Sequence, residues 1–368
     1  MAVALLSPQI HQHSSDKMQV QKWSALAGLR FVLAFIVAVT HLPDFVAIGT
    51  WDFIPKFGAF EAILGFLLIS GYSIGASYAK EPEGFLWRRA LRIYPVYLAA
   101  VALTCGVFAL EHDTFPSAWL VLVNVLFLNQ ILTSDSFVGP AWTLALEVWL
   151  YCLTPLLFKL RPSTLRALTA ASFAAYLAYT CGRTLFHWNY YSGVGFGLNL
   201  LLLSFIWLAG LRLAREPENS ISILKEVGWM FALHIVLATA IQFASSWKRG
   251  LVDEFLNSGI DHFALQAFTL VVVLWTFRRF TTYPGVGAGG SATLRLLGDI
   301  SYPMYVAHIP VFYLLKLASL ESPTLYLATV VGVSFLLYWG LDKYSQQRSS
   351  APVDSRRDAL GQMGRTET

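Results

Sequence analysis

The chain has 368 residues, of which 56% are hydrophobic and only 13% charged, and its mean hydropathy is +0.56. A soluble domain of this size would expose far more charge, so the composition excludes a soluble enzyme and indicates a polytopic helical membrane protein. The net charge of +4 is small, and the basic residues cluster between apolar runs as in cytoplasmic loops, which gives no support to nucleic-acid binding.

The two ends of the chain are polar, and the region between them is predominantly apolar. The first 22 residues contain no short apolar region with a cleavage site, so the first span is expected to be retained. We expect a cytoplasmic N-terminal segment at 1–22, a transmembrane domain at 23–341 and a polar cytoplasmic tail at 342–368. The three cysteines have no ligand-like spacing, so neither disulfides nor a metal site are expected.

The first apolar run, residues 25–44, carries two ionisable side chains, Arg30 and His41. They are eleven residues apart. At about 100° per residue this places both on one helix face to within ~20°, and roughly 16 Å apart along the axis. Ionisable groups inside a membrane are costly and usually face a bundle interior or an aqueous cavity. The pair therefore favours a functional site over two side chains that merely reach the two membrane surfaces.

Apolar runs predict ten crossings and one segment of uncertain placement. The crossings are expected at 26–46, 58–79, 91–110, 146–160, 164–186, 198–212, 224–246, 263–281, 302–320 and 323–341. If the run at 118–132 enters and returns on the outer side, every basic connection except that at 248–262 lies inside. The expected fold class is therefore an all-α transmembrane helix bundle, with about ten crossings, one re-entrant segment and both termini cytoplasmic. Eleven crossings is the alternative.

A candidate acid–base pair lies near the outer side of this topology. His41 is near the external end of the first span, and residues 139–147 enter the fourth crossing from the same side, which brings Glu147 to a comparable depth. A carboxylate beside an imidazole fixes its tautomer and raises its basicity, as is needed to deprotonate a hydroxyl. Alternatively, Glu147 stabilises the start of the helix after Pro140.

Three arginines, Arg88, Arg89 and Arg92, stand at the start of the third crossing. Arg88 and Arg92 are four residues apart and share a helix face. Several guanidiniums at a helix start suit phosphates, because their forked donors and the positive helix end act together. The alternative is an anchor that fixes membrane orientation.

A further buried polar residue, His308, lies between two helix-kinking prolines, Pro303 and Pro310, which free backbone carbonyls near it. A lone histidine in an apolar helix is more often a packing residue than a base. We therefore expect His308 to line the site, together with Trp142 and Tyr302.

These stretches, taken in order over residues 24–340, resemble the acyltransferase-3 family of integral membrane acyltransferases. The matching features are the Arg30 and His41 pair, FLLISGYSIG, WRRALRIYP, GPAWTLALEVWLY and LGDISYPMYVAHIP. Three positions depart from the family pattern: Gly139 and Thr143 replace common serines, and Val148 stands where a second glutamate often follows. The carboxylate of Glu147 is kept.

The resemblance implies a multi-pass protein of a bacterial inner membrane that transfers an acyl group, most often acetyl, without a bound cofactor or metal. The donor would be cytoplasmic acyl-CoA, and the acceptor a hydroxyl of an extracytoplasmic polysaccharide or glycolipid. The three arginines at the third crossing would hold the CoA phosphates, and Arg30 would stabilise the thioester region. His41 with Glu147 would then deprotonate the acceptor. Two rival functions remain at this stage: a proton-coupled secondary transporter, and a non-catalytic membrane partner of the same fold.

Overall fold

The structure is a computed structural model that describes residues 7–282 and 291–343. These residues form helices and no strand; Asn129 and Thr133 form an isolated bridge. The predicted all-α class is therefore confirmed for the described part of the chain. Nearly all of the expected polar tail, from residue 344 onward, lies outside the described residues.

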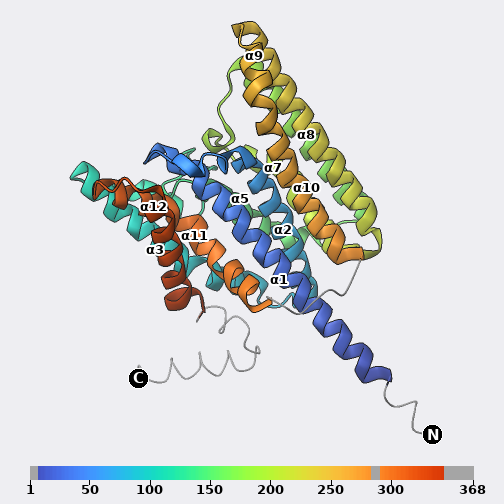
Figure 1. Cartoon of the computed structure of the whole chain (residues 1–368). Coiled ribbons are helices and arrows are strands. Elements are labelled where there is room, and N and C mark those ends of the chain that lie inside the picture. The colour runs from blue at the N-terminus through green and yellow to red at the C-terminus, as the bar shows by residue number, and fades with distance from the viewer. Residues whose placement is uncertain (1–6, 283–290, 344–368) are drawn as a thin grey trace, which may run out of the picture.

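Ten longer helices account for most of the bundle (Figure 1). They are α1 (Ser7–His41), α2 (Ala59–Lys80), α3 (Phe85–His112), α5 (Ala141–Leu157), α6 (Pro162–Phe186), α7 (Leu198–Arg215), α8 (Ser220–Arg249), α10 (Ile260–Thr282), α11 (Ser291–Leu317) and α12 (Pro323–Leu337). Two short helices are α4 (Ala118–Val125) and α9 (Val252–Glu254). Single 3₁₀ turns cover Leu42–Asp44, Gly49–Trp51, Pro55–Phe57, Tyr191–Gly193 and Pro217–Asn219, and π-helical turns cover Phe255–Gly259 and Tyr338–Asp342.

Each of the ten apolar runs predicted to cross the membrane overlaps one of these longer helices. Within the described residues, seven segments are helical, long and apolar enough to span a bilayer. They are Lys22–Asp44, Ala59–Lys80, Phe85–His112, Leu198–Arg215, Pro217–Arg249, Ile260–Arg279 and Pro323–Asp342. Helix α5 is apolar but shorter, with 17 residues.

The first helix extends beyond its apolar part. It begins at Ser7 and runs without a break to His41, so the polar segment before residue 23 is helical from Ser7 onward. Figure 1 shows this N-terminal part extending away from the bundle.

The segment at 118–132 is not one continuous helix. Helix α4 has 8 residues, which corresponds to a rise of about 12 Å, far less than the ~30 Å of a bilayer core. The loop that follows is tied down by Gln130, whose side-chain amide donates to Ser192 O at 2.8 Å and accepts from Asn199 at 2.7 Å. This part of the chain is therefore an ordered loop beside residues 187–197.

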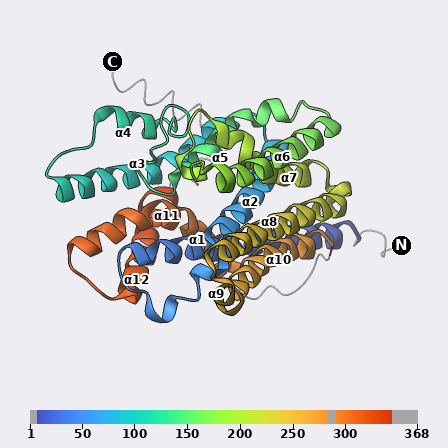
Figure 2. The ribbon, with the colours of Figure 1, turned by 90° about the horizontal axis from the view of Figure 1, so that it is seen from above.

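Helix α2 is central in both ribbon views, with α1 and α7 packed against it (Figures 1 and 2). The contact with α7 is close because glycines meet there. A Cβ on Gly71 would lie 2.0 Å from Trp207 O, and one on Gly210 would lie 2.3 Å from Leu68 O. Small residues at helix crossings let backbones approach in this way. The other face of α2 is then directed toward α1, α3, α5 and α11, where a cavity lies.

Candidate active site

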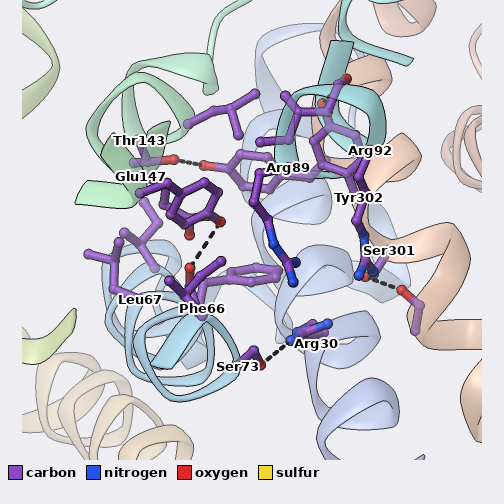
Figure 3. Close-up of a pocket in the computed structure, with 18 residues that line it drawn as sticks. Arg30, Phe66, Leu67, Ser73, Arg89, Arg92, Thr143, Glu147, Ser301 and Tyr302 are labelled. Atoms are coloured by element: carbon purple, nitrogen blue, oxygen red, sulfur yellow. Dashed lines mark hydrogen bonds between the residues drawn. The ribbon is translucent and has the colours of Figure 1, made fainter. Parts of the chain in front are cut away.

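A cavity of about 150 Å³ lies among α1, α2, α3, α5 and α11 (Figure 3). One water needs about 10–15 Å³ by a comparable measure, so the space is of the order of ten waters. Along α2 the lining runs from Ile63 to Ile74, which corresponds to about 16 Å of helix. The cavity is therefore elongated along the helix axis.

Three guanidiniums converge on this space, Arg30 from α1 and Arg89 and Arg92 from α3 (Figure 3). Arg30 donates to Ser73 Oγ at 2.5 Å, and Arg89 donates to Ser77 Oγ at 2.6 Å. Both of these partners are neutral hydroxyls and not carboxylates. Like charges repel at close range in a low dielectric, so their convergence favours an anionic ligand between them.

Glu147 lies on the side of the cavity facing the arginines (Figure 3). Its Oε2 accepts a hydrogen bond from the Tyr151 hydroxyl at 2.6 Å, and that hydroxyl lies 3.1 Å from Ser70 Oγ. Glu147 is the seventh residue of α5. Stabilisation by the helix dipole is confined to the first turn, so the position of Glu147 favours the site interpretation over the helix-start interpretation.

His41 contacts a second histidine instead of Glu147. The ring centroids of His41 and His308 are 5.3 Å apart. His41 is the last residue of α1 and does not line this cavity, whereas Glu147 lies nearly two turns inside α5. The structure therefore does not bring together the expected His41–Glu147 pair, because the two side chains differ in depth along their helices.

Both histidines have their tautomer fixed by the backbone. His41 Nδ1–H donates to Val37 O at 2.9 Å, and His308 Nδ1–H donates to Met304 O at 3.2 Å. A carbonyl only accepts, so in a neutral ring Nε2 carries the free lone pair. His308 is fully buried, and its Nε2 has no hydrogen-bond partner in the described structure.

Tyr305 connects this histidine pair to the cavity. It lines the cavity, its hydroxyl is 2.5 Å from Thr143 Oγ1 and donates to Pro140 O at 3.1 Å, and its ring is 6.3 Å from that of His308. The order from the cavity toward the end of α1 is therefore Tyr305, His308 and His41.

Arg88 faces away from its neighbour Arg89. Its guanidinium is buried, donates to the carbonyls of Glu81 and Glu83, and pairs with the Glu81 carboxylate at 3.0 Å. Arg88 lies only about 40° from Arg92 around the helix, but its contacts with Glu81 and Glu83 hold its guanidinium away, so only Arg89 and Arg92 of α3 reach the cavity. Arg88 braces the connection between α2 and α3 instead of joining the expected phosphate-binding group.

The expected lining residues have different placements. Tyr302 lines the cavity and donates to Ile93 O at 2.8 Å. Trp142 is buried but does not line this cavity, and His308 is separated from it by Tyr305.

The sequence analysis missed Tyr151 and Ser70. Tyr151 follows Glu147 by four residues and therefore lies on the same helix face, a spacing that could have identified it. Ser70 lies within the quoted segment FLLISGYSIG, but its contact with Tyr151 joins residues 81 apart in the chain. No local sequence pattern predicts such a contact.

A second buried polar cluster was also not predicted from the sequence. Glu61 Oε1 lies 2.9 Å from His234 Nε2, and Tyr176 Oη lies 2.7 Å from His234 Nδ1. These residues come from α2, α8 and α6, so only tertiary packing brings them together. In residues 7–282 and 291–343, no group of three or more His, Cys, Asp or Glu side chains is arranged to hold a metal ion, and Cys105, Cys152 and Cys181 are free thiols.

A family model described as an acyltransferase domain matches residues 23–342. The chain belongs to the acyltransferase-3 family. The family match includes every helix that lines the cavity, together with His41 and His308. An acetyltransferase-named protein of Acidianus two-tailed virus, ORF330, is 29% identical over 142 residues. That alignment covers 37% of this acyltransferase-3 chain and 41% of the viral protein, so the chain spans about two fifths of that relative. No solved structure gives a significant match.

Proposed function

We propose that this chain is a membrane O-acyltransferase that takes an acyl group, acetyl in the first instance, from cytoplasmic acyl-CoA. The acceptor is a hydroxyl of an extracytoplasmic polysaccharide or glycolipid. The observation that carries this proposal is the convergence of Arg30, Arg89 and Arg92 on a cavity that also contains the carboxylate of Glu147 (Figure 3).

The arginines suit the donor. CoA carries several phosphate charges, and guanidiniums bind phosphates through forked, charge-assisted hydrogen bonds. Arg89 and Arg92 are the fifth and eighth residues of α3, beyond its first turn, so their own charge and not the helix dipole attracts an anion here. Arg30 lies farther from this helix start, beside Ser73 of α2. It is therefore placed for the thioester end of the donor.

The topology supports transfer across the membrane. With both termini cytoplasmic, ten crossings and α4 as part of a re-entrant segment, the start of α3 faces the cytoplasm and the end of α1 faces the outside. His41 then lies at the outer end, and in its neutral ring Nε2 carries the free lone pair that can take the proton of an acceptor hydroxyl. The proposed location is the inner membrane of a bacterium, and no bound cofactor is invoked.

Removal of the two arginines of α3 tests the donor site. Arg89→Ala combined with Arg92→Ala should weaken CoA binding to the purified protein by about 10²-fold or more, because two charged hydrogen-bonding groups, each contributing about 1.5–3 kcal/mol, are lost. Titration calorimetry with CoA measures the affinity.

The matched control is Lys159→Ala combined with Arg161→Ala. Both residues are exposed basic residues between α5 and α6, outside the cavity, and their removal changes the net charge equally. Equal CoA affinity in both double variants would contradict the donor site and return Arg89 and Arg92 to the role of a membrane anchor.

A further inference from the structure

Seven hydroxyl groups line the cavity, and most of them are held by the backbone. Ser73, Ser301 and Tyr302 donate to main-chain carbonyls at 2.6–2.8 Å. Thr143 and Tyr305 lie 2.5 Å apart and both lie within 3.2 Å of Pro140 O, so their two protons are shared between each other and that carbonyl. A hydroxyl has one proton, so these five are poorly placed to give it up to a reacting group.

The other two hydroxyls form a chain that ends on a carboxylate. Tyr151 donates its proton to Glu147 at 2.6 Å, so its oxygen faces Ser70, 3.1 Å away, as an acceptor. The proton of Ser70 is therefore directed through a phenol toward a carboxylate. A serine becomes a nucleophile when a neighbouring group can take its proton and a third group orients that neighbour.

We propose that Ser70 is the nucleophile of this cavity and carries the acyl group as an ester between two half-reactions. This inference rests on the proposed function, since it takes acyl-CoA as the donor. It goes further by naming the covalent site and the groups that move its proton.

The first half-reaction forms the ester. Ser70 Oγ attacks the thioester carbonyl carbon while its proton passes to Tyr151, and the Tyr151 proton passes to Glu147. The carbon–sulfur bond then breaks, its electron pair leaves on sulfur, and the CoA thiolate takes a proton from cytoplasmic water. The products are acyl-Ser70, free CoA and protonated Glu147.

The second half-reaction releases the acyl group. The acceptor oxygen attacks the ester carbonyl, and its proton passes through water toward the outer side, where His41, beyond Tyr305 and His308, takes it. As the bond to Ser70 Oγ breaks, that oxygen takes the proton of the Tyr151 hydroxyl. Tyr151 in turn takes the proton held by Glu147. The proton on His41 is released to the outer side. The cycle thus restores every group of the protein, and for each acyl group transferred it leaves one hydroxide in the cytoplasmic water and one proton outside.

The surroundings of Ser70 suit this role. Ser73, one turn away on α2, holds the Arg30 guanidinium at 2.5 Å, so a positive charge lies close to where the carbonyl oxygen becomes negative. Gly71 fixes the neighbouring backbone against α7. A nucleophile on a rigid helix keeps its geometry better than one on a loop.

An exchange assay detects the ester without knowledge of the acceptor. The purified full-length protein is mixed with unlabelled acetyl-CoA and labelled CoA, with no acceptor present. A covalent intermediate lets label pass from free CoA into acetyl-CoA, and direct transfer to an acceptor does not. We expect exchange by the wild type and an acetyl group on the peptide that contains Ser70 by mass spectrometry.

Substitutions locate the ester. Ser70→Ala should bind CoA but lose exchange by at least about 10³-fold, and Tyr151→Phe should slow exchange by about 10²–10⁴-fold because the proton relay is interrupted. The matched control is Ser334→Ala, which removes another buried serine hydroxyl, on α12, that donates to Val330 O at 2.6 Å and does not line the cavity. It should exchange at the wild-type rate.

Two results would overturn the inference and leave the proposed function intact. One is CoA binding and acyl transfer by the wild type without exchange; the other is an acetyl group on a residue other than Ser70. Absence of CoA binding by the wild type would instead overturn the proposed function, and this inference with it.

Discussion

At the scale of single residues, direction on the helix decides what each charged group does. Arg88 and Arg89 are consecutive, yet Arg88 binds the carbonyls of the loop before α3 while Arg89 points into the cavity. Glu147 and Tyr151 are four residues apart and share a face, so the carboxylate orients the phenol. Chemical type alone would not separate these roles.

The first prediction at this scale concerns His41. His41→Ala should lower acyl transfer to the acceptor by about 10²–10⁴-fold, because the proposed base is removed. CoA binding and the acetyl-CoA exchange reaction should persist, since Arg89, Arg92 and Ser70 are untouched. Transfer is measured by mass spectrometry of surface glycans, and exchange with purified protein.

A conservative variant separates chemistry from packing at His41. His41→Asn keeps a donor near the position of Nδ1, which bonds to Val37 O, but lacks Nε2. It should be as inactive in transfer as the alanine variant. Full transfer by either variant would remove His41 from the mechanism.

At the scale of helices, the cavity depends on how closely α2 approaches α7. Gly71 and Gly210 lie where the backbones meet, and a Cβ on Gly75 would lie 2.8 Å from Ala214 Cβ. In a membrane, where lipid is as apolar as the side chains, close packing of this kind is a main force between helices. It fixes the rotation of α2 and hence the direction of Ser70.

Gly71→Ala should therefore destabilise the protein strongly. The added methyl meets the carbonyl oxygen of Trp207, which belongs to the backbone and cannot rotate away. Overpacking a tight site costs about 1–3 kcal/mol, and a backbone clash lies at the upper end. Thermal unfolding in detergent should show a clear fall in midpoint.

The control for this prediction is Gly332→Ala in α12. No atom lies within 4 Å of a Cβ added there. Alanine is the better helix former by about 1 kcal/mol, so this variant should be neutral or slightly stabilised. Equal midpoints for Gly71→Ala and Gly332→Ala would mean that the α2–α7 contact does not hold the fold.

At the scale of the whole molecule, α2 has polar groups on two sides. Ser70 and Ser73 face the cavity with α1, α3 and α5, while Glu61 pairs with His234 of α8 on another side. Figure 2 shows α2 between these two groups of helices. Breaking a buried hydrogen-bonded pair leaves its partners unsatisfied, which is costly, so the Glu61–His234 contact helps to fix α8 against the central helix.

The proposed membrane orientation gives a prediction at this scale. In a variant without the three native cysteines, Lys80→Cys should react with a membrane-impermeant maleimide only after the membrane is opened. Lys248→Cys should react in intact cells, because the proposed topology puts the α8–α9 connection outside. Both side chains are exposed, so access depends on sidedness. The opposite labelling pattern would invert the proposed direction of transfer.

Part of the site could be predicted from the sequence, because it depends on the spacing of residues along single helices. Arg89 and Arg92 are three residues apart at a helix start, and Glu147 follows a helix-initiating proline, so their helices and approximate depths follow from helical periodicity. The contacts from Ser70 to Tyr151 and from His41 to His308 join helices distant in the chain. They depend on the rotation of each helix, which no local pattern determines.

The sequence by itself determined an all-helical chain with spans of membrane length, because apolar runs of that length have few alternatives in water or lipid. It also determined the acyltransferase-3 family, through motifs carried in order along those spans. Only the tertiary structure decided that Glu147 bonds to Tyr151 and that His41 contacts His308. Helix rotation and depth are set by packing, here by glycines where α2 meets α7, and packing is a property of the assembled bundle.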